Sequence, residues 1–387
     1  MLMVGIDCLR GKDFDVLRGK RVGLLSHQAA VTDDGSTSAQ LLHRVLGDRL
    51  VALYGPEHGF FGQAGAGEHT YTRPHPDWDI PVYSLYGEQR KPSPEMLEGV
   101  DIVVCDLQDL GVRCYTYLAT LRNMLEACGE AQVEVLVADR PIPLPEIVEG
   151  PMLDPTFASF VAPAPLPMVY GMTPAEAALW MKKKLGLDDL ALSVAPIEDV
   201  KRADLARSSG LDWIPPSPGI KSWEATMTYA ATVFSEALPG IDCGRGTNLA
   251  FRVFGAPWIK AEECCLVLSQ LPLQGVTFHP YRYTAGIAPY AGQELDGVRL
   301  CVNDPSRFLP AMTSAGILMT LTNLYGAARV WQHEGVRPEW FDKLYGGGQT
   351  REALTRSSET ILTELVSVWE KDCNAFKRER EEVLLYK

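Results

Sequence analysis

The chain has 387 residues, long enough for two domains, and its 46% hydrophobic and 22% charged residues are ordinary for a globular protein. Its net charge of −13, with no basic run beyond 181–184, argues against nucleic acid and anionic membrane surfaces as partners. The composition is compatible with a neutral substrate, or with an anionic one that local positive charge guides to a site.

The beginning of the chain and its cysteines indicate the compartment. The first residues lack the basic region, the long apolar stretch and the cleavage site of a secretory signal, and no apolar window is long enough to span a membrane. Nine cysteines stand in apolar contexts without a CxxC pair, which favours reduced, buried thiols. We therefore expect a cytoplasmic protein with no structural metal site.

Short apolar runs alternate with helical patterns through the first half of the chain. The predicted strands are 1–7, 21–26, 50–54, 81–83, 100–105 and 133–138, and the predicted helices are 36–46, 94–97 and 117–128. Strands that are apolar on both faces and separated by helices are typical of βαβ units. We predict a Rossmann-like α/β domain with a parallel sheet, whose ligands bind beyond the carboxyl ends of the strands.

A capped helix and a proline-rich linker close this domain. Thr173 is placed to cap a helix that begins at Pro174, with Glu176 in the capping-box position; a strand at 190–196 and a helix at 197–205 follow. Three prolines within 215–218 deny the backbone both helix and central strand. We therefore predict a first domain over 1–218 and a smaller C-terminal α/β domain over 219–387.

The second domain mixes strands and helices. We predict strands at 251–254, 275–283 and 297–302, and helices at 260–271 and 305–325. The final stretch, 352–385, is rich in good helix formers and is predicted to be helical.

The most informative candidate site is Glu57 beside His58, on a turn rich in glycine and proline directly after the strand at 50–54. Glycine and proline on both sides force sharp changes of backbone direction there. An isolated Glu-His pair is usually just solvated on a surface loop. Other polar clusters follow later strands in this chain, however, and that recurrence favours a functional site.

The densest polar cluster follows the strand at 100–105. It contains Gln108, Asp109, Arg113, Tyr115 and Tyr117. Arginine can bind a carboxylate through two parallel hydrogen bonds, while amides and carboxylates bind hydroxyl groups, so the cluster favours a ligand such as a sugar. The alternative is that the Asp109 and Arg113 side chains pair with each other and cap the next helix.

Further candidates stand at the ends of other predicted elements. His27 follows the strand at 21–26, and Asp139 with Arg140 follows the strand at 133–138. Arg245 lies between two glycines, which let the backbone pass close to a ligand. The chain contains neither GxGxxG nor GxxxxGK[ST], so nucleotide binding is poorly supported and we expect no cofactor.

Several motifs, in this order, resemble one family. They are GPEHG at 55–59, DLQDLGVRCYTY at 106–117, DRP at 139–141, YGMT at 170–173, PSP at 216–218, GRGT at 244–247 and GAPW at 255–258. Together they resemble the NamZ family of exo-β-N-acetylmuramidases over nearly the whole chain. The resemblance implies a Rossmann-like N-terminal domain, a smaller C-terminal domain, and a glycosidase that releases N-acetylmuramic acid from the non-reducing end of peptidoglycan fragments.

The resemblance also suggests roles for the catalytic candidates. Glu57 becomes the leading catalytic carboxylate, with His58 beside it; Glu57 would donate a proton if burial among Tyr54, Phe60 and Phe61 raised its pKa. A second group is needed to stabilise or attack the anomeric carbon. Asp109 is the first choice; Asp106, Glu236 and the acetamido group of the substrate are the alternatives.

The remaining candidates are substrate contacts. The lactyl carboxylate that distinguishes muramic acid from glucosamine needs a cation, which Arg113, Arg140 or Arg245 would supply. The other predicted contacts are His27, Gln108, Tyr115, Tyr117, Asp139, Tyr170 and Glu236. The substrate is thus expected to be a small muramyl glycan or muropeptide.

Two other functions compete with the glycosidase. A two-domain α/β protein with hydroxyl-binding residues along one edge of its sheet could also bind a sugar or wall fragment without cleaving it. A nicotinamide-dependent enzyme is suggested by the βαβ pattern alone, and the missing glycine fingerprint counts against it.

Overall fold

A seven-stranded sheet organises the first half of the chain, with the strand order β3-β4-β2-β1-β5-β6-β7. The computed structural model describes residues 3–206, 213–356, 358 and 360–387. The strands are β1 Val22–Ser26, β2 Leu50–Gly55, β3 Arg73–Pro74, β4 Pro81–Ser84, β5 Ile102–Asp106, β6 Glu134–Ala138 and β7 Leu192–Ala195. All neighbouring strands are parallel except β3 and β4, which confirms the predicted parallel α/β sheet.

Helices cover both faces of this sheet, which is why its central strands are apolar on both sides. Leu25 and Val103 pack on one face with α3 (Tyr117–Ala131) and α4 (Pro174–Lys184). Leu24 and Val104, one position away, pack on the other face with α1 (Gly5–Gly11) and α2 (Ser38–Leu46). Each strand therefore supplies two hydrophobic cores in alternation.

Two predicted elements of the first half are wrong. Of the strand predicted at 1–7, residues 1–2 lie outside the described residues, and helix α1 begins at Gly5, since a short apolar run does not distinguish a strand from a helix. Gly5 allows this packing: a Cβ there would lie 2.3 Å from the Ala195 carbonyl oxygen and from the Asp139 nitrogen, at the ends of β7 and β6. The helix expected at 197–205 is only a short 3₁₀ turn, η5 (Arg202–Ala206).

The C-terminal lobe is built on a smaller, three-stranded antiparallel sheet in the order β8-β10-β9. Its elements are α5 Trp223–Thr232, β8 Val253–Gly255, α6 Ala261–Gln270, β9 Val276–Thr284, β10 Glu294–Val302, α7 Pro310–Tyr325, α8 Ala327–Trp331, α9 Pro338–Tyr345 and α10 Gln349–Leu354. The strands predicted at 251–254, 275–283 and 297–302 and the helices predicted at 260–271 and 305–325 are present with shifted ends, whereas α5, α8 and α9 carried no recognised sequence signal. The stretch predicted to be helical, 352–385, includes 357 and 359, which lie outside the described residues; α10 ends at Leu354, and a second helix follows over Ile361–Arg380.

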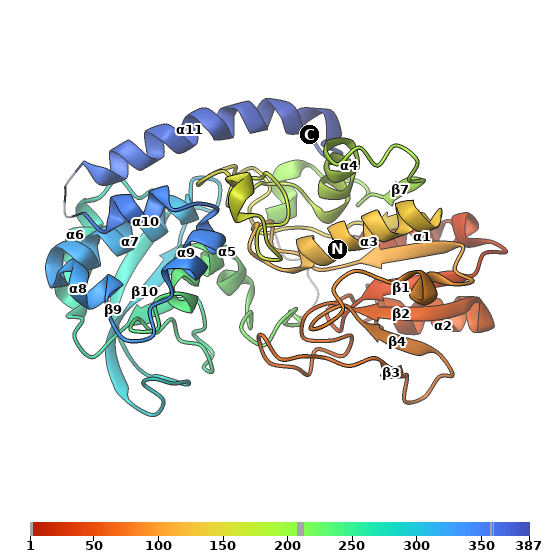
Figure 1. Cartoon of the computed structure of the whole chain (residues 1–387), viewed down its shortest axis with the longest axis horizontal. Helices are drawn as coiled ribbons and strands as arrows, with labels where there is room; N and C mark the ends of the chain where they lie inside the picture. The colour runs from red at the N-terminus through yellow and green to blue at the C-terminus, as the bar shows by residue number, and fades with distance from the viewer. Residues whose placement is uncertain (1–2, 207–212, 357, 359) are drawn as a thin grey trace.

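Helix α11 (Ile361–Arg380) returns from the C-terminal lobe to the N-terminal lobe, which is built on the seven-stranded sheet (Figure 1). The Phe376 ring packs edge-on against Trp180 of α4, with ring centroids 5.7 Å apart. Beyond it, the hydroxyl of Tyr386 donates to the Asp139 carboxylate at the end of β6. The C-terminal segment therefore ties the two lobes together.

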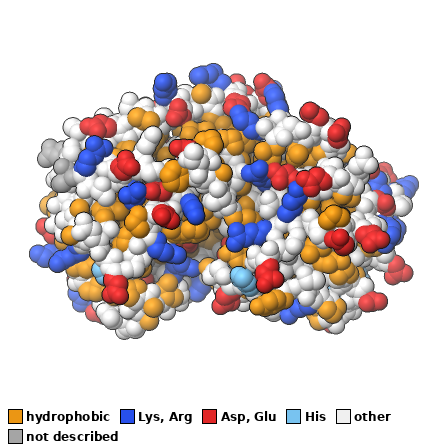
Figure 2. Space-filling view, in the orientation of Figure 1, with side chains coloured by type: hydrophobic (Ala, Val, Ile, Leu, Met, Phe, Trp, Pro, Cys, Tyr) orange, Lys and Arg blue, Asp and Glu red, His pale blue; other side chains and the backbone are white. Residues whose placement is uncertain are grey.

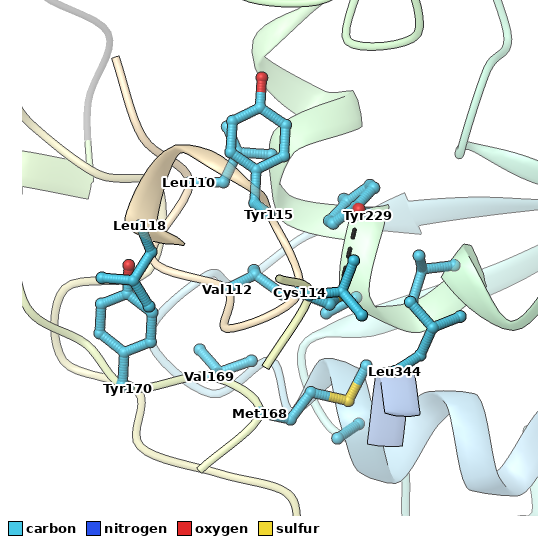
Figure 3. Packing of buried hydrophobic residues seen from close by; sticks show 14 of the residues in the cluster. Leu110, Val112, Cys114, Tyr115, Leu118, Met168, Val169, Tyr170, Tyr229 and Leu344 are labelled. Carbon is cyan, nitrogen blue, oxygen red and sulfur yellow. Dashed lines mark hydrogen bonds between the residues drawn. The ribbon is translucent and has the colours of Figure 1, made fainter. Parts of the chain in front are cut away.

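The loop after β5 forms a second connection between the lobes. Its apolar side chains pack with those of α5 and α9, as the cluster around Val112, Tyr229 and Leu344 shows (Figure 3). Cys114 points toward the Tyr229 hydroxyl, at 4.0 Å.

The proline-rich linker predicted near 215–218 is bound to the N-terminal lobe, because the carbonyl oxygen of Pro215 accepts a 2.8 Å hydrogen bond from the Gln28 side chain. The boundary at 218/219 stays a prediction.

Candidate active site

A cavity of about 480 Å³ lies between the two lobes, beyond the carboxyl ends of β2 and β5. Figure 2 shows a hollow between the lobes with lysine and arginine side chains gathered beside it. The polar and aromatic lining includes Glu57, His58, Tyr86, Arg90, Tyr115 and Thr116 from the N-terminal lobe, and Tyr229, Glu236, Arg245, Arg337, Trp340 and Lys343 from the C-terminal lobe. This is the edge at which parallel sheets bind ligands.

Glu57 is presented by a tight turn after β2. A Cβ on Gly55 would lie 2.4 Å from the Phe60 nitrogen, so only glycine lets the chain fold back this closely. The Glu57 carboxylate accepts hydrogen bonds from the Thr116 hydroxyl (2.7 Å) and the Gly67 N–H (3.0 Å). These two donors fix the carboxylate at the cavity wall.

The aromatic residues expected around Glu57 lie elsewhere. Phe60 and Phe61 line a neighbouring hollow of about 260 Å³, which shares only His58 with the larger cavity. Tyr54 is fully buried and donates a 2.6 Å hydrogen bond to the Met96 carbonyl. The sequence therefore identified the turn but not the surroundings of its carboxylate.

His58 has a constrained ring orientation. Its backbone φ is +72°, in the left-handed region that costs a residue with a Cβ about 1 kcal/mol or more. The Nδ1 atom lies 3.0 Å from the Ala64 carbonyl oxygen, which can only accept, so Nδ1 carries a hydrogen. In the neutral ring Nε2 is then left with a free lone pair.

Glu236 is the carboxylate that the C-terminal lobe contributes. It ends the 3₁₀ turn η6 (Val233–Glu236), and its Oε1 lies 3.8 Å from Nη1 of Arg245. Desolvation in the cavity raises the pKa of Glu236 above its ordinary value, and the nearby charge of Glu57 adds to this, although Arg245 opposes it. Arg337 donates to the backbone carbonyl of Glu236.

Tyr86 lines the same cavity and is affected by the charges of both carboxylates. Burial raises the pKa of Tyr86 to about 12, with the Glu57 charge as the next cause and the Glu236 charge contributing as well. Its hydroxyl therefore stays protonated near neutral pH and remains a donor in the cavity.

Five of the predicted site residues line this cavity and eight do not. Those that line it are Glu57, His58, Tyr115, Glu236 and Arg245. Those outside its lining are His27, Gln108, Asp109, Arg113, Tyr117, Asp139, Arg140 and Tyr170. The second set lies behind the cavity wall, where its members bind one another and the backbone.

Arg113 and Asp109 illustrate this buried set. Arg113 has no exposed surface and donates to the carbonyls of Pro151 (2.8 Å), Leu166 (2.6 Å) and Leu344 (3.3 Å), so it joins the lobes. Asp109 accepts from the Gly111 N–H (2.7 Å) and the Tyr170 hydroxyl (2.8 Å). The alternative interpretation, a pairing of Asp109 with Arg113, is wrong, because each group has other partners.

The strand-end candidates around β1, β5 and β6 are likewise engaged. His27 Nε2 accepts from the Gln108 N–H at 2.9 Å, and burial holds the pKa of His27 far below its usual value, so the ring is neutral. Arg140 forms a buried ion pair with Asp106. Burial raises the pKa of Asp139 to about 7, and its carboxyl group receives the Ala175 N–H.

Several cavity residues were missed by the sequence argument. Thr116 and Ser217 stand inside quoted motifs, yet neither was given a role, and Ser217 was interpreted only as part of a linker. Arg90 follows a short predicted strand without a distinctive pattern. The residues that α9 and the turn before it contribute (Arg337, Trp340 and Lys343) belong to an element that was not predicted.

Similarity to a known family identifies the chain. The family model for the N-terminal domain of exo-β-N-acetylmuramidase NamZ matches residues 22–224, and the model for its C-terminal domain matches residues 227–386. The chain belongs to the NamZ family. The NamZ peptidoglycan β-N-acetylmuramidase of Bacillus subtilis is 36% identical over 386 residues, covering 100% of this chain and 91% of the relative.

Two solved structures share the NamZ fold seen here. Both are DUF1343 family proteins from Bacteroides fragilis, with TM-scores of 0.91 and 0.77 and identities of 32% and 25%. Each alignment covers 100% of this chain and 99% of the other. Within the described ranges, no helix is long and apolar enough to cross a membrane, and no cluster of three or more His, Cys, Asp or Glu side chains is arranged to hold a metal ion.

Proposed function

We propose that this chain is an exo-β-N-acetylmuramidase that hydrolyses the glycosidic bond of a non-reducing terminal N-acetylmuramic acid in peptidoglycan fragments. The observation that carries the proposal is that, in a NamZ family member, Glu57 and Glu236 line one cavity from two different lobes. Glycoside hydrolysis needs a proton donor and a second group that stabilises or attacks the anomeric carbon. Two carboxylates around one cavity supply that pair.

The surroundings of the two carboxylates favour different roles. Glu236 has a raised pKa, which suits the acid that protonates the leaving oxygen. Two hydrogen bonds hold the Glu57 carboxylate at the cavity wall, which suits a group fixed to face the anomeric carbon. This assignment exchanges the role first given to Glu57 and places Glu236, rather than the buried Asp109, as its partner.

His58 and Tyr86 complete this proposed mechanism. With its Nδ1 hydrogen directed to the Ala64 carbonyl, His58 can use Nε2 to accept a proton from the attacking water. The protonated Tyr86 hydroxyl can donate to a sugar hydroxyl or to Glu57. The proposed substrate is a small muramyl glycan or muropeptide. The cytoplasmic location expected from the sequence stays a prediction.

Turnover of a chromogenic N-acetylmuramide tests the proposal. The wild-type protein should release the chromophore and free N-acetylmuramic acid, and Glu57→Gln should lower kcat by about 10²–10⁴-fold, the usual loss for a general acid, base or nucleophile. Glu88→Gln is the matched control, because it makes the same change from carboxylate to amide at an exposed residue of the same lobe. Saturable binding without any product in the wild type would favour the non-catalytic sugar-binding alternative.

A further inference from the structure

The cavity is positively charged although the chain as a whole is acidic. Four cationic side chains line it, Arg90, Arg245, Arg337 and Lys343, against two carboxylates, Glu57 and Glu236. The net charge of the whole chain is −13. A cavity with excess positive charge attracts anionic ligands and concentrates them locally. One of these cations is therefore available for the lactyl carboxylate of the substrate.

We infer that Arg90 binds this carboxylate and makes the site selective for muramic acid over glucosamine. The inference rests on the proposed function, since it names the group that recognises that substrate. Of the arginines considered from the sequence alone, Arg113 and Arg140 are buried and lie outside the cavity lining. Arg245 lines the cavity, but its Nη1 atom lies 3.8 Å from the Glu236 carboxylate, at the site of the second carboxylate.

Arg90 is oriented by two aromatic rings. Its guanidinium carbon lies 4.7 Å from the centroid of the Phe160 ring and 5.6 Å from that of Tyr86. A guanidinium that stacks on a ring keeps the N–H groups in its plane free, and these match the two oxygens of a carboxylate. Stacking also limits the motion of the side chain, which lowers the entropy lost on binding.

Arg90 is also placed to bind the lactyl carboxylate of the same sugar on which Glu57 is proposed to act. Tyr86 bridges the two, because its ring lies beside Arg90 and its hydroxyl interacts with Glu57. The backbone is anchored, because the Arg90 carbonyl accepts a 2.8 Å hydrogen bond from the Asn123 side chain. No carboxylate among the described residues pairs with Arg90.

The other cations of the cavity are less suitable. Arg245 accompanies Glu236, and Arg337 donates to the Glu236 backbone carbonyl while its guanidinium carbon lies 5.6 Å from the centroid of the Trp340 ring. Lys343 is exposed and flexible, and its ammonium group offers a point charge without the planar pair of donors. Lys343 is nevertheless the alternative candidate for this role, and the experiment tests it with Lys343→Met.

The test compares two chromogenic substrates that differ only in this group: the N-acetylmuramide and its lactyl methyl ester. Arg90→Met should lower kcat/KM for the acid by about 10–100-fold, the range for losing a hydrogen-bonded charge, and should leave the ester within about twofold. Arg90→Lys should restore only part of the preference, because lysine lacks the paired donors. Circular dichroism and the melting temperature check that each variant is folded.

Two controls separate the possible failures. Lys91→Met removes a neighbouring charge outside the cavity lining and should keep the wild-type preference for the acid. If Arg90→Met loses activity equally on both substrates, or if Lys343→Met alone abolishes the preference, the assignment to Arg90 is wrong while the muramidase proposal stands. If the wild type cleaves neither substrate, the proposed function itself fails.

Discussion

The polar side chains singled out in this protein form two groups that differ in how fully their hydrogen-bonding capacity is used. The buried set, which includes Asp106, Asp109, Arg113, Asp139 and Arg140, pairs within the protein, as the ion pair of Arg140 with Asp106 shows. The cavity set, which includes Glu57, Tyr86, Arg90 and Glu236, faces an open space of about 480 Å³.

The difference shows what a dense polar cluster means in this fold. A charge removed from water must find partners, so buried polar residues organise the loops that carry a site. Residues that act on a ligand instead keep part of their bonding capacity facing the cavity. The loop after β5 contains both kinds, because Thr116 reaches Glu57 while Arg113, three residues earlier, binds carbonyls from both lobes.

Glu236→Gln should produce an effect as large as that of Glu57→Gln, and these two are the largest effects expected in the cavity set. Loss of the acid should lower kcat by about 10²–10⁴-fold for a substrate with a poor leaving group and far less for a dinitrophenyl leaving group, which needs no proton. The raised pKa predicts a pH dependence too: only protonated Glu236 donates, so kcat/KM falls as pH rises through that pKa. A pH–rate profile of wild type and variant measures this.

An equal loss on both leaving groups would show that Glu236 is not the acid. Glu57→Gln provides the contrast, since a group that faces the anomeric carbon is needed whatever the leaving group is. Glu88→Gln should behave as wild type on both substrates, because Glu88 is exposed and does not line the cavity.

Arg113→Met tests the buried set and should act on stability rather than on chemistry. The substitution leaves the carbonyls of Pro151, Leu166 and Leu344 without their donor, and each unsatisfied buried group costs about 1–3 kcal/mol. We expect the free energy of unfolding to fall by about 3 kcal/mol, measured by urea denaturation, while the acid-over-ester preference of the folded enzyme persists.

Arg378→Met is the matched control for this prediction, because Arg378 is exposed on α11 and should change stability by less than about 0.5 kcal/mol. If Arg113→Met is as stable as the wild type but no longer prefers the N-acetylmuramide over its methyl ester, Arg113 belongs to the binding site and not to the buried set.

Local patterns predicted most of the N-terminal lobe. The strands β1, β2, β5 and β6 are apolar on both faces, and Thr173 caps α4 with Glu176 in the capping box, as the sequence indicated. The turn at Glu57 was found because glycine and proline mark such turns in any fold. These features depend only on neighbours in the chain, which is why they can be recognised without a structure.

The composition of the cavity depends on contacts between distant segments, and the sequence could not supply these. Arg337 and Trp340 reach the cavity from the start of α9, about 280 residues after Glu57. Whether Arg113 or Arg90 faces the ligand depends on where the lobes meet, since both arginines follow strands of the same sheet. Polarity and position along the chain identify the edge of the sheet, while the approach of the second lobe decides which side chains stay accessible.

Thr116→Val should have the smallest effect. It tests the loop after β5, which carries both the buried Arg113 and the Thr116 hydroxyl that contacts Glu57 in the cavity. The hydroxyl donates to Glu57 over 2.7 Å, so its removal should free the carboxylate to rotate and lower kcat/KM by about tenfold, equivalent to about 1.4 kcal/mol. Thr116→Ser keeps the donor and should retain most of the activity. If valine and serine are equally active, the Thr116 hydroxyl does not position Glu57, and the Gly67 N–H alone suffices to hold the carboxylate for catalysis.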